Sequence, residues 1–312
     1  MKTAFIFPGQ GAQHVGMGKE IADAFAPAAE ILEQANEILG FDLRRICFEG
    51  PAQQLDATTI SQPAIFVTSA AILNLLRTDG AGDSLICDVT AGLSLGEYTA
   101  LYAAGVIEFE QALLLVRKRG QAMQEAADEQ AGAMVSIIGL DEEKANQLCA
   151  EAAQGELLKA VNFNCPGQIV ISGTKTACRR AEQLAPKYEA IKALPLEVAG
   201  AFHTDMMAPA AACLERALAD AAIRDPADIK VIANINAEYY KTADEIRQGL
   251  TKQLTCPILW QRCMEKLIAD GVELFYEIGP SRVLTGLMKR INRKARVVNA
   301  SSVDALNELL RS

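Results

Sequence analysis

Short apolar runs rich in β-branched and aromatic residues alternate along the chain with longer segments of helical pattern. Residues 4–7 (AFIF) predict a buried strand, the following PGQG predicts a turn, and a second strand is expected near 86–91. Residues 28–39, 63–77 and 97–127 have the periodicity of helices. This alternation is typical of α/β proteins, in which helices cover the faces of a sheet.

One internal segment, residues 131–199, has its own order of elements. Its pattern predicts a strand, a helix, two strands, a helix and a strand, and this βαββαβ order is that of a ferredoxin-like unit. Helix and strand alternation then resumes, with a strand at 230–235 and a helix starting near Pro257. We therefore expect a small subdomain (131–199) inserted into a large subdomain built from 1–130 and 200–312.

Composition limits the classes of function. A chain of 312 residues, 50% hydrophobic and 22% charged, can bury a sizeable core, and its net charge of −9 argues against nucleic-acid binding. No apolar stretch approaches the roughly 18 residues of a membrane helix, so we expect a cytoplasmic protein without a membrane partner. Eight scattered cysteines without a CxxC pair predict reduced thiols, and two histidines are too few for a histidine-rich metal site.

The pentapeptide GLSLG at 92–96 matches the G-x-S-x-G pattern of a nucleophile elbow, a sharp turn that exposes a serine between a strand and a helix. It follows the expected strand and precedes a helix that begins near Glu97. Flanking glycines remove side chains that would clash at such a turn, and the helix N-terminus can stabilise negative charge. Ser94 is therefore either a nucleophile or an ordinary turn residue.

A serine nucleophile needs a base, and the chain offers only His14 and His203. His203 lies in GAFHTD, where the inserted segment ends and a helix begins with Thr204 as its expected N-cap. It is either the base or a histidine that merely fills a helix start. His14 lies in the N-terminal glycine loop, which lacks the third glycine of a dinucleotide-binding motif. A loop that brings backbone N–H groups near a reacting centre explains the same glycines.

Two basic segments each have two interpretations. Arg119 ends the helical run VRKR, and its side chain either is solvated or turns inward, where its planar fork could hold a carboxylate through two hydrogen bonds. KRINRKAR at 289–296 carries five basic residues and no acid in a chain of net negative charge. It is either a solvated helix end or a docking site for an acidic protein.

Seven motifs in order resemble the malonyl-CoA:acyl carrier protein transacylases of fatty-acid synthesis. They are FPGQGAQ, SQPAIF, GLSLGEYTAL, VRKRGQAMQ, VNFNCPGQIVISG, GAFHTDMM and EIGPSRVLTGLMKRI, and they run from about residue 3 to about residue 300. The resemblance implies an α/β-hydrolase-like large subdomain that carries an inserted ferredoxin-like subdomain.

The resemblance also implies roles for residues of the catalytic centre. Ser94 becomes the nucleophile, His203 its base and Arg119 the clamp on the malonyl carboxylate. Gln253 would orient His203 through its carbonyl oxygen, in the place where other triads have an acid. Phe202 matches the malonyl-selective form of its motif, in which a smaller residue would leave room for a branched acyl group.

Further positions are implied around the cleft. Gln10 and Leu95 would supply backbone N–H groups for the oxyanion, and Gln62 and Asn162 would line the cleft. Leu93 departs from the family pattern, which usually has histidine before the serine, so polarity or packing under the elbow should differ.

The implied reaction is a ping-pong transfer of malonyl from malonyl-CoA to the phosphopantetheine thiol of acyl carrier protein, through a malonyl-serine. It needs no metal or redox cofactor. The carrier would dock on the basic segment, at Lys289, Arg290, Arg293 and Lys294, and we expect a monomer. The alternatives are a free-standing acyltransferase of a polyketide pathway, a serine hydrolase or thioesterase on the same fold, and a non-catalytic carrier-binding protein.

Overall fold

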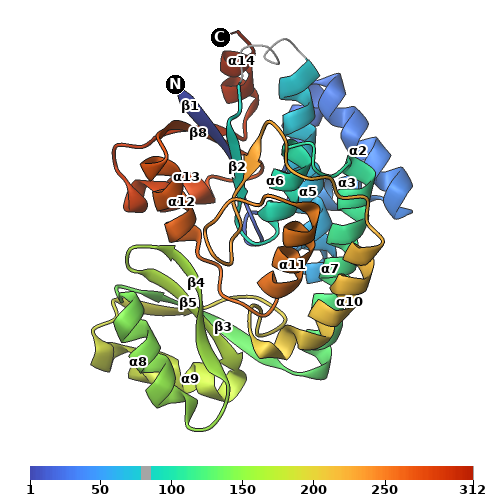
Figure 1. Ribbon diagram of the computed structural model, residues 1–312. Coiled ribbons are helices and arrows are strands. Elements are labelled where there is room, and N and C mark those ends of the chain that lie inside the picture. Colours follow the sequence, from blue (N-terminus) through green and yellow to red (C-terminus); the bar gives the residue numbers. More distant parts are fainter. Residues whose placement is uncertain (79–85, 312) are drawn as a thin grey trace.

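The computed structural model describes residues 1–78 and 86–311 and places the main sheet at the centre of the larger part (Figure 1). This sheet has five strands in the order β7-β2-β1-β8-β9, and every adjacent pair is parallel. Its strands are β1 (Lys2–Phe7), β2 (Val89–Gly92), β7 (Lys230–Val231), β8 (Val272–Ile278) and β9 (Arg296–Ala300). Register pairs Phe7 with Gly92, so β1 and β2 end side by side just before the glycine loop and the elbow.

Helices cover both faces of this sheet because the side chains of β1 alternate between two cores. Ala4 and Ile6 belong to a cluster with the helices after residue 259, whereas Phe5 and Phe7 pack with the helices drawn on the right of Figure 1. The bounds of the helices are α1 (Lys19–Ala24), α2 (Ala26–Leu39), α3 (Leu43–Glu49), α4 (Ala52–Asp56), α5 (Thr58–Thr78), α6 (Gly96–Ala103), α7 (Phe109–Glu129), η2 (Asp205–Met207), α10 (Ala208–Ala219), α11 (Ala243–Gln253), α12 (Trp260–Ala269), α13 (Val283–Ile291) and α14 (Val303–Arg311).

Helix α5 alone among the described helices is long and apolar enough to cross a membrane. Its most apolar stretch is 83% buried inside the protein, which identifies α5 as a core helix. All eight cysteines carry free thiols.

The second part is an antiparallel sheet in the order β4-β5-β3-β6, which is the ferredoxin-like strand order. Its strands are β3 (Gly132–Ile138), β4 (Leu158–Cys165), β5 (Gln168–Thr174) and β6 (Lys192–Pro195), and its helices are α8 (Glu142–Ala153), α9 (Lys175–Leu184) and the short η1 (Ala185–Tyr188). All of these elements fall between the expected limits of 131 and 199. The α/β fold class with a ferredoxin-like insertion is confirmed.

The chain enters and leaves the small subdomain at one place. A Cβ on Gly132 would lie 2.5 Å from the backbone nitrogen of Ala201, and a Cβ on Gly200 would lie 2.6 Å from the Cβ of Ala127. Only glycine allows the two crossing segments to approach so closely. The return crossing brings His203 back beside the large sheet.

The expectation of one helix over 97–127 is wrong. The structure ends α6 at Ala103 and begins α7 at Phe109, and Gly105 between them adopts a φ of +69° that a helix does not permit. Val106 and Ile107 of the connection are buried, so the hydrophobic pattern of the sequence continues across the break.

Two further boundaries differ from expectation. The strand expected at 230–235 stops at Val231, because the chain turns away to place Asn234 beneath the elbow. The helix expected near Pro257 starts only at Trp260, since Ile258 is extended and exchanges backbone hydrogen bonds with Val161 and Phe163 of β4. That pairing ties the two subdomains together.

Candidate active site

Ser94 sits on a strained turn between β2 and α6. Its φ is +52°, a left-handed conformation that residues with a side chain rarely adopt, and its backbone N–H donates to Asn234 Oδ1 at 2.7 Å. A Cβ on Gly92 would lie 1.8 Å from the carbonyl carbon of Gly96, and a Cβ on Gly96 would lie 2.2 Å from the carbonyl oxygen of Phe7. Both glycines are therefore required for the turn, and the geometry is that of a nucleophile elbow.

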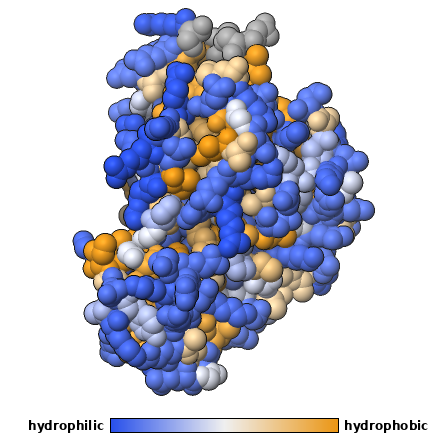
Figure 2. Space-filling view, turned by 60° about the vertical axis from the view of Figure 1, so that its left-hand side comes forward, coloured by the Kyte–Doolittle hydropathy of each residue, from blue (hydrophilic) through white to orange (hydrophobic). Residues whose placement is uncertain are grey.

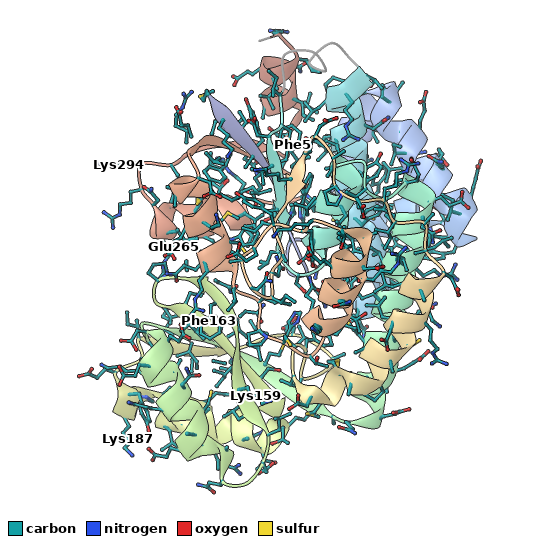
Figure 3. The ribbon with its side chains drawn as sticks, viewed as in Figure 1. Phe5, Lys159, Phe163, Lys187, Glu265 and Lys294 are labelled. Carbon is teal, nitrogen blue, oxygen red and sulfur yellow. The ribbon has the colours of Figure 1, made fainter. Side chains whose placement is uncertain are left out.

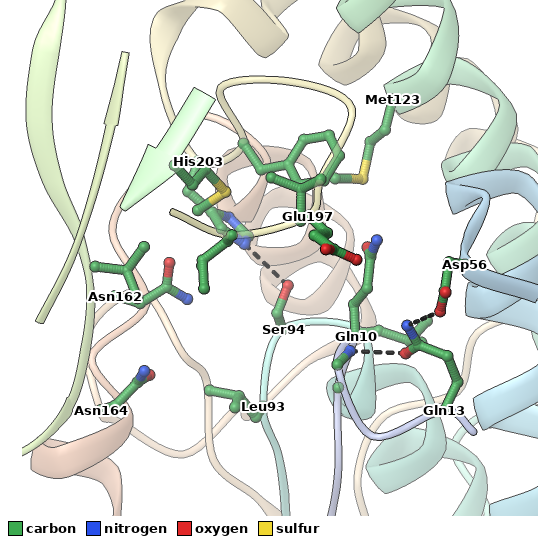
Figure 4. A pocket seen from close by; sticks show the side chains of 18 of the residues that line it. Gln10, Gln13, Asp56, Leu93, Ser94, Met123, Asn162, Asn164, Glu197 and His203 are labelled. Carbon is green, nitrogen blue, oxygen red and sulfur yellow. Dashed lines mark hydrogen bonds between the residues drawn. The ribbon is translucent and has the colours of Figure 1, made fainter. Parts of the chain in front are cut away.

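His203 lies opposite Ser94, and one of the dashed lines in Figure 4 joins the two side chains. Its Nε2 is 3.0 Å from Ser94 Oγ, and its Nδ1 is 2.7 Å from the backbone carbonyl oxygen of Gln253. A carbonyl can only accept, so Nδ1 carries the hydrogen and Nε2 presents its lone pair to the serine hydroxyl. Burial, and then the nearby Arg119 cation, lower the pKa of His203 to about 3. The imidazole is neutral at physiological pH and can accept a proton.

Arg119 is the inward-turned arginine of the VRKR run on α7. Its side chain is 1% exposed, whereas Lys118 beside it is exposed to solvent. Nη2 donates to Ser94 Oγ at 3.0 Å and to Gln253 Oε1 at 3.0 Å, and Nη1 donates to Gln62 Oε1 at 2.8 Å. A buried guanidinium next to the nucleophile is suited to bind an anionic group of a substrate.

The position of Gln62 differs from expectation. Its side chain is fully buried behind Arg119, where it accepts from the guanidinium and donates to the sulfur of Met123, and it does not belong to the described lining of the pocket. Gln62 sits inside the long helix α5, on the face that packs against α7, and both of its amide contacts are to α7 side chains. Gln62 fixes the arginine and does not contact the cavity.

The pocket around Ser94 has a volume of about 300 Å³ and lies between the two subdomains. Figure 4 shows Asn162 and Asn164 of β4 on one side and the glycine loop with Gln10 on the other. The remaining lining residues are Gly9, Gly11, Gln13, Asp56, Leu93, Leu95, Arg119, Met123, Met134, Val170, Leu196, Glu197, Val198, Phe202 and His203.

The glycine loop reaches the elbow directly. A Cβ on Gly9 would lie 2.3 Å from the carbonyl oxygen of Leu93, so the loop can approach only because this residue is glycine. This contact brings the backbone of Gln10 to the pocket, where Leu95 begins the turn into α6. The side chain of Leu93 is half-buried and faces the pocket below Ser94 (Figure 4).

His14 lies outside this site. It lines a second cavity of about 490 Å³ together with residues near α1 and the loops before α13 and α14. Within residues 1–78 and 86–311, no cluster of three or more His, Cys, Asp or Glu side chains could hold a metal ion.

The basic segment starts in the last turn of α13. Lys289, Arg290, Arg293 and Lys294 are all exposed, and Arg290 also donates to the carbonyl oxygens of Pro166 (2.9 Å) and Gly167 (3.3 Å) in the turn after β4. Figure 3 shows Lys294 pointing outward, and Figure 2 shows a mainly hydrophilic face from the side on which α13 lies. These positive charges stand next to the junction of the subdomains, close to the strand that carries Asn162 and Asn164.

Sequence reasoning missed three residues beneath the elbow. Glu97 is fully buried and accepts hydrogen bonds from the hydroxyl of Tyr240, the backbone N–H of Asn234 and the side-chain amide of Gln253. A signal for Glu97 was present, because it is the only charged residue of the segment GEYTALYA. No local pattern pointed to Asn234 or Tyr240, which reach the elbow from more than a hundred residues away.

The sequence matches a known protein family, and a known protein of similar length, over nearly the whole chain. Residues 4–308 match the model of the acyl transferase domain. The chain is 42% identical over 306 residues to the malonyl CoA-acyl carrier protein transacylase of Bacillus subtilis, with 98% of this chain and 95% of that protein covered.

Two solved structures are similar over the whole chain. One is the malonyl CoA-acyl carrier protein transacylase of Coxiella burnetii, with a TM-score of 0.95, 36% identity and coverage of 100% of this chain and 97% of that chain. The other is a malonyl-transacylase in complex with its type II polyketide acyl carrier protein, with a TM-score of 0.95, 39% identity and coverage of 100% and 99%.

Proposed function

Because the chain belongs to the acyl transferase family, we propose that it transfers a malonyl group from malonyl-CoA to the thiol of acyl carrier protein. The observation that carries the proposal is the double contact at Ser94 Oγ, which lies 3.0 Å from a neutral histidine nitrogen and 3.0 Å from the buried Arg119 guanidinium. The histidine can activate Ser94 for acyl transfer, and the guanidinium favours an acyl group that carries a carboxylate.

The first half-reaction acylates Ser94. His203 Nε2 takes the hydroxyl proton while Ser94 Oγ attacks the thioester carbonyl of malonyl-CoA. The carbon–sulfur bond then breaks, and the departing CoA sulfur takes the proton from His203. In the second half-reaction the carrier thiol gives its proton to His203 and attacks the malonyl ester, and Ser94 recovers the proton as it leaves. The chemistry requires no metal or redox cofactor, and one chain supplies both nucleophile and base, so a monomer suffices.

The tetrahedral intermediates need donors for their negative oxygen. Gln10 and Leu95 supply their backbone N–H groups from the two segments that Gly9 allows to meet. Leu95 also stands at the N-terminus of α6, where the helix dipole favours negative charge. Asn162 faces the same pocket from β4 and borders the acyl group.

Arg119 holds the malonyl carboxylate. The carboxylate accepts from the guanidinium through Nη2, which releases Ser94 Oγ for attack. A serine hydrolase that acts on neutral esters would gain nothing from a guanidinium buried beside the nucleophile, because its substrate has no carboxylate for the guanidinium to bind.

Partition of the acyl group between thiol and water tests the function. The malonyl-enzyme is isolated and mixed with holo carrier, which has the phosphopantetheine thiol, or with apo carrier, which lacks it. We expect malonyl-carrier to form with holo carrier only, at a rate that rises with carrier concentration. Loss of malonyl at the same rate with either carrier would instead establish a hydrolase. Carriers from fatty-acid and polyketide synthesis, compared side by side, separate the two pathways.

The acidic carrier docks on the exposed charges at Lys289, Arg290, Arg293 and Lys294. Arg290 also braces the turn after β4, so the cleaner test is the double variant Arg293→Glu/Lys294→Glu, with Lys118→Glu on the distant helix α7 as a matched control. The double variant should weaken carrier binding and reduce its salt dependence, whereas Lys118→Glu should not. If the native protein, the double variant and Lys118→Glu bind the carrier with equal affinity, the basic segment is an ordinary solvated surface and not the docking site.

A further inference from the structure

A buried carboxylate below the active site has no part in the proposed acyl transfer. Glu97 lies in the first turn of α6, three residues after the nucleophile, and its side chain is fully buried. Oε1 accepts from the Tyr240 hydroxyl at 2.5 Å, and Oε2 accepts from the backbone N–H of Asn234 at 3.1 Å and from Gln253 Nε2 at 2.9 Å. These three hydrogen bonds favour the ionised carboxylate, whereas its burial favours the protonated form.

The side chain of Gln253 connects this carboxylate to the arginine. Its Oε1 accepts from Arg119 Nη2 at 3.0 Å, and its Nε2 donates both to Glu97 Oε2 and to the backbone carbonyl of Ser94. Arginine can only donate and a carboxylate can only accept, so the amide has one possible orientation. One amide therefore stands between the buried cation and the buried anion.

Above about pH 7, where Glu97 is ionised, the charges of Arg119 and Glu97 cancel in the empty site. The other titratable groups that face the network are neutral near pH 7: burial keeps the pKa of His203 low and raises the pKa of Tyr98, Tyr240 and Cys263. A malonyl carboxylate that binds Arg119 would add a second negative charge to this enclosed region. Uncompensated charge is costly there, so one of the two carboxylates must be neutralised.

We propose that Glu97 is a positioning residue that acts as the counter-ion of Arg119 in the empty site and takes up one proton from solution when a carboxylate-bearing acyl group binds. The malonyl carboxylate then replaces Glu97 as the partner of the guanidinium. This inference rests on the proposed function and concerns the same site.

The network can accommodate that proton. Of the three partners of Glu97, the Tyr240 hydroxyl can reverse its role and accept a hydrogen bond from a protonated Oε1, while the two N–H donors remain on Oε2. Burial raises the pKa of Glu97 to about 7, although Tyr240, Gln253, Asn234 and Arg119 each favour the charged form. A small change in local charge is therefore enough to protonate Glu97 near neutral pH.

The sign of the pH dependence follows from linkage. Below about pH 7 Glu97 of the free protein is already protonated, so malonyl-CoA affinity does not change with pH. Above pH 7 binding must take up a proton, and the affinity falls by up to about tenfold per pH unit until Glu97 also ionises in the complex. Acetyl-CoA has the same CoA phosphates and no acyl carboxylate, so its affinity should lack this fall.

Calorimetry measures the proton directly. Malonyl-CoA and acetyl-CoA are titrated into the inactive variant Ser94→Ala at pH 8, in two buffers of different ionisation enthalpy. We expect malonyl-CoA to take up close to one proton more than acetyl-CoA. Adding Glu97→Gln should abolish the difference. Adding Tyr240→Phe, which removes one donor to the carboxylate, should move the onset of the pH dependence to higher pH.

Glu277→Gln is the matched control. Glu277 is also fully buried and accepts from Leu284, Thr285 and Asn299, but none of these donors connects it to Arg119 in the way that Gln253 connects Glu97. This variant should keep the extra proton. Equal uptake for the two ligands in the protein with native Glu97, or uptake that survives in Glu97→Gln, would overturn the proposal. If the protein with native Ser94 still forms a malonyl-enzyme, only this inference fails; if it does not, the proposed function fails.

Discussion

Replacement of Arg119 by alanine should separate malonyl transfer from acetyl transfer. The guanidinium is 1% exposed, lines the pocket and is 3.0 Å from the nucleophile oxygen, so it can hold a carboxylate in an enclosed site. Removing one partner of a buried ion pair costs about 3–5 kcal/mol. Because the pocket is open to solvent on one side, we take the lower part of that range and expect malonyl kcat/KM to fall by about 10²- to 10³-fold.

Acetyl-CoA should lose much less. It has no carboxylate for Arg119, and at the reacting centre the variant removes one hydrogen bond, from the guanidinium to the neutral Ser94 hydroxyl, which is worth about 1.5 kcal/mol or roughly tenfold. The malonyl-to-acetyl ratio of kcat/KM should therefore fall by about 10- to 100-fold.

Single-turnover acylation, followed by intact mass with each CoA ester, gives both constants. Arg119→Lys is the companion variant, since lysine keeps the charge and loses the fork, and it should fall between alanine and arginine. Circular dichroism establishes that each variant is folded. Equal losses on malonyl-CoA and acetyl-CoA would refute the carboxylate clamp.

Three further predictions concern the elbow, the pocket wall and the base. Gly96→Ala places a Cβ 2.2 Å from the carbonyl oxygen of Phe7 and should lower the free energy of unfolding by about 1–3 kcal/mol in thermal melts. Gly286→Ala on α13 is the control, because its Cβ would meet nothing within 4 Å and should not destabilise the protein. Equal melting temperatures of the two variants would exclude the close contact at Gly96. Phe202→Ala opens the buried wall of the pocket and should raise the methylmalonyl-to-malonyl ratio of kcat/KM in a competition assay, and an unchanged ratio would show that Phe202 does not limit the acyl group. Because burial lowers the pKa of His203 to about 3, the rate of acetylation of Ser94 should show no histidine limb between pH 5 and 8; a limb near pH 6.5 would mean that His203 is charged there.

The residues that the sequence predicted well belong to local patterns. The elbow follows from a strand, a G-x-S-x-G turn and a helix that are contiguous in the chain, and the inserted unit follows from six elements in an unbroken order. His203 followed because only two histidines exist and His14 occupies a glycine loop. The elbow and the inserted unit were predictable because their elements follow one another directly in the chain. His203 was predictable because the chain has only one other histidine.

The residues that the sequence did not predict depend on tertiary contacts. Gln62 is 57 positions from Arg119, and nothing in the pattern of α5 shows which face of that helix turns to α7. Asn234 leaves the sheet to bind Ser94 from 140 positions away, and a run of strand-forming residues hid that turn. The expected helix over 97–127 concealed the break at Gly105 because the connection contains two buried apolar residues, Val106 and Ile107, which continue the hydrophobic pattern.

Intact-mass measurement with peptide mapping, after brief exposure to malonyl-CoA, tests the central claim most directly. We expect one malonyl group per chain, located on Ser94, absent from Ser94→Ala and removed when holo carrier is added, with malonyl-carrier as the product. A malonyl adduct that persists in Ser94→Ala, or a protein that never becomes acylated while malonyl-carrier still forms, would show that Ser94 does not carry the acyl group.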